Sequence, residues 1–234
     1  MTFLQNLDPA FDPPDSLALA LFLAAWLLIG WVIEHPPQRR LSVCVLMQSY
    51  RREWMVQFIT RQPRIFDATL IESLRQGTAF FASASMIAIG GGVALITNAA
   101  TVVGLAQDLT IGVEAAEVQV KVVLVLALMG NALLKFVWSN RLFGYCAILM
   151  AAVPNDISDP RVQGMARQAA EINITAARSF NRGLHSVYFA LCGLSWLIGP
   201  LAFAATTLAT SAVLIRREFA SHSRQVILEG MPTV

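Results

Sequence analysis

Charged residues are scarce in this sequence. Only 14% of its 234 residues are charged and 56% are hydrophobic, whereas a soluble domain carries roughly a quarter charged residues. A chain this apolar has too few polar side chains to cover its own surface in water, but in lipid that cover is not needed. The composition therefore predicts an integral membrane protein. A net charge of +2 gives no reason to expect a nucleic-acid partner.

Cysteines, histidines and enzyme motifs also give little indication of a chemical function. The cysteines and histidines are scattered along the chain: Cys44, Cys146 and Cys192; His35, His185 and His222. No spacing among them matches a disulfide framework or a zinc site, and there is no HExxH, GxSxG or P-loop motif. We therefore expect no cofactor and no metal. The missing motifs count against an enzyme, although membrane enzymes with unfamiliar sites exist.

Long apolar runs, in contrast, recur along the chain. Runs of about 20 residues, long enough to cross the hydrocarbon core as helices, predict spans at 16–33, 74–98 and 118–137, the last continuing as a helix to 152. Two shorter runs, 183–198 and 201–215, flank Gly199-Pro200, where proline breaks or kinks a helix. The sequence thus predicts an all-α polytopic membrane helix bundle. It has about five transmembrane helices, or four if the last two runs cross as one.

Two segments between the spans mix arginines with apolar residues at helical spacing, 38–72 and 155–182. Such a pattern predicts cytoplasmic amphipathic helices, lying on the membrane surface or packed beneath the bundle. The apolar stripe of the second segment consists of Val162, Met165, Ala166, Ala169, Ile172, Ala176 and Phe180. We treat 1–234 as a single membrane domain.

Basic residues are absent from 1–38 and 76–120, whereas seven of the 17 lie between 39 and 75. Since basic loops stay in the cytoplasm, this distribution predicts an N-terminus outside and a cytoplasmic C-terminus, in a bacterial inner membrane. That topology needs five crossings. Four crossings would leave Arg216 and Arg217 outside.

Four strings resemble the sequence of one membrane family. They are RREWMVQFITRQPRIFDATLIESLRQGTAFFAS at 51–83, LLKFVWSNRLFGYCAILMAAVP at 133–154, FNRGLHSVYFALCGLSWLIGP at 180–200 and RREF at 216–219. The family is domain of unknown function 599, a set of uncharacterised integral membrane proteins. The resemblance covers most of the chain from about residue 40 onward. It implies a helical fold in a membrane and no particular chemistry.

Polar residues at membrane depth are the candidates for function. Asn131 and Lys135 share one face of the third span, because they are four residues apart. The structural interpretations are an interhelical hydrogen bond for Asn131 and a snorkelling side chain for Lys135. The sharper hypothesis is a polar path or interface, to which Glu72 would contribute the opposite charge. Its other candidate residues, near the cytoplasmic interface, are Asn140, Arg141, Arg182 and His185.

We expect a non-enzymatic bundle that acts as a homo-oligomer or as an accessory subunit of another membrane protein. The span 74–98 is rich in small residues, which let helices approach closely in lipid. One alternative is an ion or small-solute channel or transporter that uses the Asn131/Lys135 face. Another is an anionic-lipid-binding protein whose arginines in 39–64 contact the headgroups of the bilayer.

Overall fold

The computed structural model describes residues 12–97 and 115–230. Residue 98, the predicted end of the second span, lies outside this range. The described helices are α2 (Pro13–Glu34), α3 (Val43–Thr60), α4 (Ile65–Thr97), α6 (Ala115–Ala152), α7 (Val162–Leu194), the 3-10 turn η1 (Ser195–Leu197), α8 (Pro200–Phe219) and α9 (His222–Glu229). These residues include no strand, so the predicted all-α fold is confirmed.

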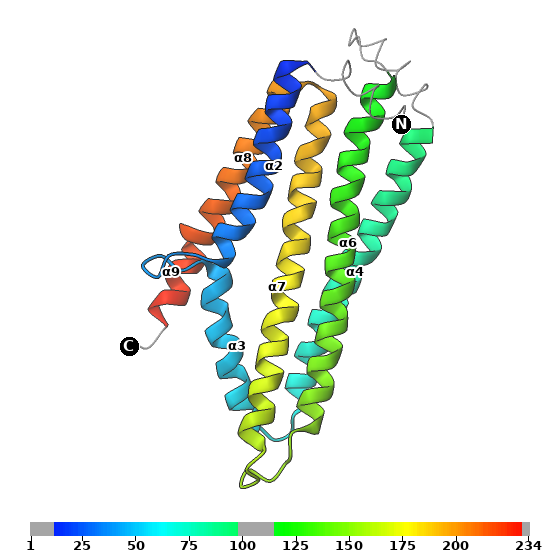
Figure 1. The fold of residues 1–234 in the computed structure, drawn as a ribbon. Helices are drawn as coiled ribbons and strands as arrows, with labels where there is room; N and C mark the ends of the chain where they lie inside the picture. Colours follow the sequence, from blue (N-terminus) through cyan, green and yellow to red (C-terminus); the bar gives the residue numbers. More distant parts are fainter. Residues whose placement is uncertain (1–11, 98–114, 231–234) are drawn as a thin grey trace.

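The helices form one elongated bundle (Figure 1). Helices α4, α6 and α7 run along it in alternating directions, while α2 and α3 follow one another along one side. Helix α6 packs against α4 and α7, α3 packs against α7, and α2 packs against α8. We call the part that contains α2, α8 and the adjoining halves of α6 and α7 the upper region. The part that contains α3 and the loop 153–161 is the lower region.

Aromatic side chains form the core of the upper region. Phe22, Phe189, Trp196 and Phe203 are buried together where α2, α7, η1 and α8 meet. The ring centroid of Phe22 lies 4.8 Å from that of Phe203 and 5.4 Å from that of Phe189. Trp196 stacks on Phe203 with the centroids 5.0 Å apart. These contacts hold α2 and α8 against the upper half of α7.

Smaller and more flexible side chains fill most of the lower core, together with Phe58 and Phe143. Met55, Ile71, Cys146, Ala166 and Ala169 are buried in one cluster drawn from α3, α4, α6 and α7. Four members of the predicted apolar stripe are buried here, on one side of α7. They are Val162, Ala166, Ala169 and Ala176. The small alanines let α3 and α6 approach α7 closely.

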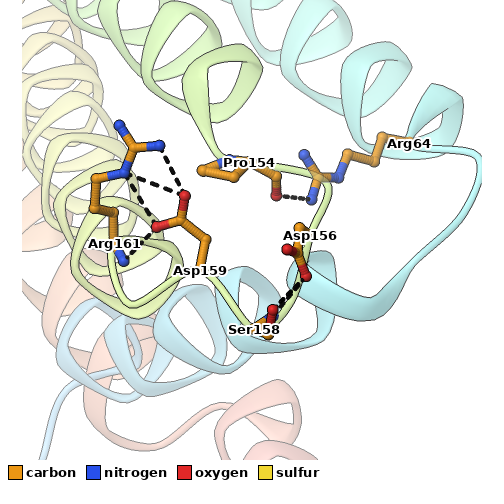
Figure 2. Close-up of polar contacts among 6 residues, drawn as sticks. All are labelled: Arg64, Pro154, Asp156, Ser158, Asp159 and Arg161. Carbon is orange, nitrogen blue, oxygen red and sulfur yellow. Dashed lines mark hydrogen bonds and ion pairs between the residues drawn. The ribbon is translucent and has the colours of Figure 1, made fainter.

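The helix ends at the bottom of the lower region are capped by charged side chains (Figure 2). The Arg64 guanidinium donates to the carbonyls of Val153, at 2.8 Å, and Pro154, at 3.2 Å. A cation suits the end of α6, because the last carbonyls of a helix are unpaired and partly negative. In the following turn, the Asp159 carboxylate accepts hydrogen bonds from the side chain and from the backbone N–H of Arg161, which hold the pKa of Asp159 at about 2.

The boundaries of the predicted amphipathic segments differ from the helix boundaries. The segment 38–72 contains all of α3, a turn and the first residues of α4. Pro63 lies in that turn, and proline disfavours helix at the residue before it. The segment 155–182 and the run 183–198 share one helix, α7, since no proline interrupts 162–194.

Three helices are long and apolar enough to cross a membrane: Pro13–Glu34, Ile65–Thr97 and Glu117–Ala152. Their outer surfaces support a membrane location, because large apolar side chains such as Phe80 and Ile87 of α4 are exposed. The last apolar stretch turns back on itself. Gly199 has a φ of +145°, which glycine adopts readily, and α8 returns from Pro200 antiparallel to α7 (Figure 1).

Candidate functional site

A lateral groove of about 330 Å³ opens between α2, α6 and α7 in the upper region. We call it the interfacial groove. Four of the predicted candidate residues line it: Asn131, Lys135, Arg182 and His185. The remaining polar lining consists of Glu34, His35 and Ser186. Residues from three helices, up to 152 positions apart in sequence, therefore meet at one place.

Asn131 and Lys135 lie on the side of α6 that faces α7, but they differ in their contacts. The amide of Asn131 donates to the Ser186 hydroxyl at 2.7 Å, which links α6 to α7. The Lys135 ammonium is half-buried in the groove. No carboxylate in the described ranges lies within ion-pair distance of it. Asn131 thus joins the helices, and Lys135 leaves a positive charge in the groove.

Glu34 and Arg182 form a two-pronged ion pair across the groove. The Nε–Oε1 and Nη2–Oε2 distances are both 2.5 Å. Glu34 is the last residue of α2, so this pair fixes the lower end of α2 to the middle of α7. Parallel hydrogen bonds between guanidinium and carboxylate add geometric specificity as well as energy. The Glu34 carboxylate neutralises the charge of Arg182. The groove keeps a net positive charge, which belongs to Lys135.

His185 lies directly against α2. Its Cε1 would be 3.3 Å from a Cβ at Gly30, so glycine at that position makes room for the ring. The ring also contacts Phe189 edge-on, with the centroids 4.9 Å apart. Its Nε2 is buried and has no hydrogen-bond partner among the described residues. His185 therefore closes the inner wall of the groove.

Indole rings form the outer edge of the groove. Trp31 is 61% exposed and stacks on His35 with the centroids 5.4 Å apart. Trp26 and Leu27 continue the wall one turn closer to the N-terminus of α2. Tryptophan favours the boundary between hydrocarbon and water. The edge thus has the side chains typical of a membrane interface.

Three predicted candidates lie elsewhere. Asn140 donates to the Arg75 carbonyl and to the Thr78 hydroxyl, both at 2.9 Å, and so joins α6 to α4. Arg141 is exposed and donates to the hydroxyl of Tyr145 at 2.6 Å on its own helix. Glu72 pairs with Arg75 on the surface of α4 at 3.3 Å.

The carboxylate of the groove belongs to Glu34, which the sequence-based candidates did not include. A signal for it exists in the sequence. Glu34 directly follows the first apolar run, and no other acidic residue lies between Asp15 and Glu53. A carboxylate at the end of a span is suited to pair with a cation of a neighbouring helix at the same depth.

The aromatic core lies between the groove and the upper end of the bundle. Phe22, Phe189 and Phe203 are fully buried there. Closer to the upper end, the Trp196 indole donates to Asp15 at 2.6 Å. Lys121 is buried there and forms an ion pair with Glu117. Among the described residues, these aromatic side chains fill the space where α2, α7, η1 and α8 meet.

Comparison with known proteins supplies a family and no activity. The family model described as "Protein of unknown function, DUF599" matches residues 17–223. The chain belongs to this family, which confirms the resemblance seen in its sequence. No curated protein and no solved structure matches the chain.

Proposed function

Starting from membership of a family without an assigned activity, we propose that this chain is a non-enzymatic membrane bundle that binds an anionic phospholipid headgroup in the interfacial groove. The phosphate would lie against the Lys135 ammonium, and the acyl chains would follow Trp26 and Leu27 along α2. One observation carries the proposal: Lys135 has no ion-pair partner among the described residues and lines a groove that is open to the side of the bundle.

The proposal includes the topology. Five crossings, with the N-terminus outside and the C-terminus in the cytoplasm, would place the lower region in the cytoplasm. The 22 residues of α2 rise about 33 Å at about 1.5 Å per residue, close to the thickness of the hydrocarbon core. Its last residue, Glu34, would then lie at the cytoplasmic interface. Anionic headgroups and basic side chains attract each other at that depth.

The aromatic core argues for a binding site and against a channel within one chain. A solute path needs polar or water-filled space across the bilayer. Phe22, Phe189, Trp196 and Phe203 instead pack without solvent exposure next to the groove. The groove is open at its side, as a lipid site requires. It therefore suits a ligand that arrives from the bilayer.

Assembly with other membrane helices is part of the same proposal. Helix α4 packs mainly against α6, and Phe80 and Ile87 remain exposed on its other side. A second copy of the chain would bind to this side of α4 in a homo-oligomer. Another membrane protein would bind there if the chain is an accessory subunit. Crosslinking in native membranes tests this. A chain that crosslinks to no neighbour would contradict the assembly and leave the lipid site untouched.

Replacing Lys135→Gln tests the lipid site. We expect wild-type protein purified in detergent to retain added phosphatidylglycerol in preference to phosphatidylcholine, and to gain thermal stability from it, since a ligand that binds the native state stabilises it. The variant should lose the preference, because the groove loses its unpaired cation. Native mass spectrometry counts the retained lipids.

Arg141→Gln is the matched control. It removes one positive charge from the same helix, at an exposed position outside the groove. It should keep the preference for phosphatidylglycerol. Equal retention of both lipids by the wild type, or equal loss in the two variants, would contradict the proposal.

A further inference from the structure

A second cavity, of about 380 Å³, lies between α3, α7, α8 and α9. We call it the arginine pocket. Three guanidinium groups line it, those of Arg51, Arg178 and Arg217. The amides of Gln48 and Asn181 add uncharged donors to its wall. Its volume is in the range of sites that hold small ligands.

The pocket has more positive than negative charge. None of its arginines lies within ion-pair distance of a carboxylate of the described chain. Its one acidic side chain is Glu218, which accepts a hydrogen bond from the backbone N–H of Cys44 at 3.0 Å. That N–H belongs to the first turn of α3, where the helix dipole stabilises a negative charge. Glu218 therefore has a partner of its own.

Two of the three arginines donate to neutral groups. Arg51 donates to the buried side-chain oxygen of Asn173, and Arg217 donates to the Tyr188 hydroxyl at 2.8 Å. Burial lowers the pKa of Arg51, because desolvation disfavours its charged form. A partly buried cation without a counter-charge is costly, and an anion in the pocket would reduce this cost.

We propose that the arginine pocket binds a small anion with phosphate groups. Guanidinium groups match phosphate oxygens with paired donors and keep their charge at any physiological pH. Three of them around one cavity suit a ligand with more than one negative charge. The amides of Gln48 and Asn181 would bind the remaining phosphate oxygens.

The pocket and the interfacial groove are separate sites joined by a narrow space. A cavity of about 50 Å³ between them shares Glu34, Arg182 and His185 with the groove. The same cavity shares Asn181 and Arg217 with the pocket. The pocket and the groove have no lining residue in common, so they are two sites.

Inorganic pyrophosphate is the probe for the test. We expect the full chain in detergent to bind it by isothermal titration calorimetry, and Arg178→Gln to bind it at least about tenfold more weakly, the loss typical of a charged hydrogen bond. Arg167→Gln, exposed on the same helix, is the control and should match the wild type. A second pair, Arg217→Gln against the exposed neighbour Arg216→Gln, repeats the comparison on α8. Thermal unfolding shows which variants are folded, and only those are compared.

Two results would overturn the proposal: no binding of pyrophosphate by the wild type, or equal weakening in each variant and its control. Nanodiscs identify the source of the phosphate. Displacement of pyrophosphate by phosphatidylglycerol, but not by phosphatidylcholine alone, indicates a lipid headgroup. Binding that is unchanged in both nanodiscs indicates a soluble ligand. Lys135→Gln should leave pyrophosphate binding unchanged, so the two proposed sites can fail independently.

Discussion

The upper and lower regions share helices α6 and α7 but hold them together in different ways. The upper region buries a cluster of aromatic rings. Its polar contacts include neutral hydrogen bonds, such as that between Ser195 Oγ and Thr206 Oγ1 at 2.6 Å, and the ion pairs of Glu34 with Arg182 and of Glu117 with Lys121. The lower region buries mainly aliphatic side chains, alanine and methionine, together with Phe58 and Phe143, and it has ion pairs at its surface, such as Arg52 with Glu171 at 2.6 Å. One pair of helices thus changes its surroundings along its length. In the proposed topology, lipid would surround the upper region and water would surround the lower region.

Substituting one phenylalanine in each core tests whether the two regions have different solvents. Phe58→Ala in the lower core should lower the free energy of unfolding by about 3–5 kcal/mol, as large-to-small changes do in water. Phe22→Ala should cost less, because lipid is as apolar as the core and only packing is lost. Both side chains are at most 2% exposed, so burial is matched. Equal losses, measured by reversible unfolding in mixed micelles, would contradict lipid around the upper region.

Gly183→Ala tests the junction of the regions, where Gly183 of α7 packs against Phe136 of α6. A Cβ at Gly183 would lie 2.6 Å from Cε1 of the fully buried Phe136 ring. We expect a loss of about 1–3 kcal/mol from overpacking. Gly144→Ala is the control, since a Cβ there meets no atom within 4 Å and alanine favours helix. Unfolding of both variants at the same denaturant concentration would contradict the close contact between Gly183 and Phe136.

The smallest effect concerns the acidic turn of the lower region. Hydrogen bonds from Arg161 lower the pKa of Asp159 to about 2 from the usual 3.8. Because the folded pKa is depressed, the stabilisation is present above the usual pKa and is lost as pH falls through the folded value. The wild type should therefore unfold at a slightly higher temperature than Asp159→Asn at pH about 5, and the difference should vanish near pH about 2. A difference in unfolding temperature that grows as the pH falls would contradict this prediction.

Much of the fold follows from local patterns in the sequence. Runs of about 20 apolar residues locate α2, α4 and α6, since crossing the hydrocarbon core sets their length. The family signatures predict the same helical membrane fold, and the matched family is the expected one. The turn at Gly199 was visible as well, because proline and glycine interrupt helices wherever they occur.

The site was only partly predictable, because its geometry depends on how helices pack. The spacing of Asn131 and Lys135 gives their common face. The pairing of Glu34 with Arg182 joins residues 148 positions apart and follows from no local rule. The arginine pocket was missed for the same reason. Arg51, Arg178 and Arg217 come from three helices, and arginine alone does not distinguish a pocket from a surface.

The side of the membrane on which the lower region lies is the central claim, and labelling of introduced cysteines tests it most directly. Asp12→Cys and Asp159→Cys would be made singly in a chain whose own three cysteines are replaced. We predict that an impermeant thiol reagent labels the cysteine at 12 on intact cells and the cysteine at 159 only after the membrane is opened. Labelling at position 159 on intact cells would contradict the topology and the cytoplasmic placement of the groove.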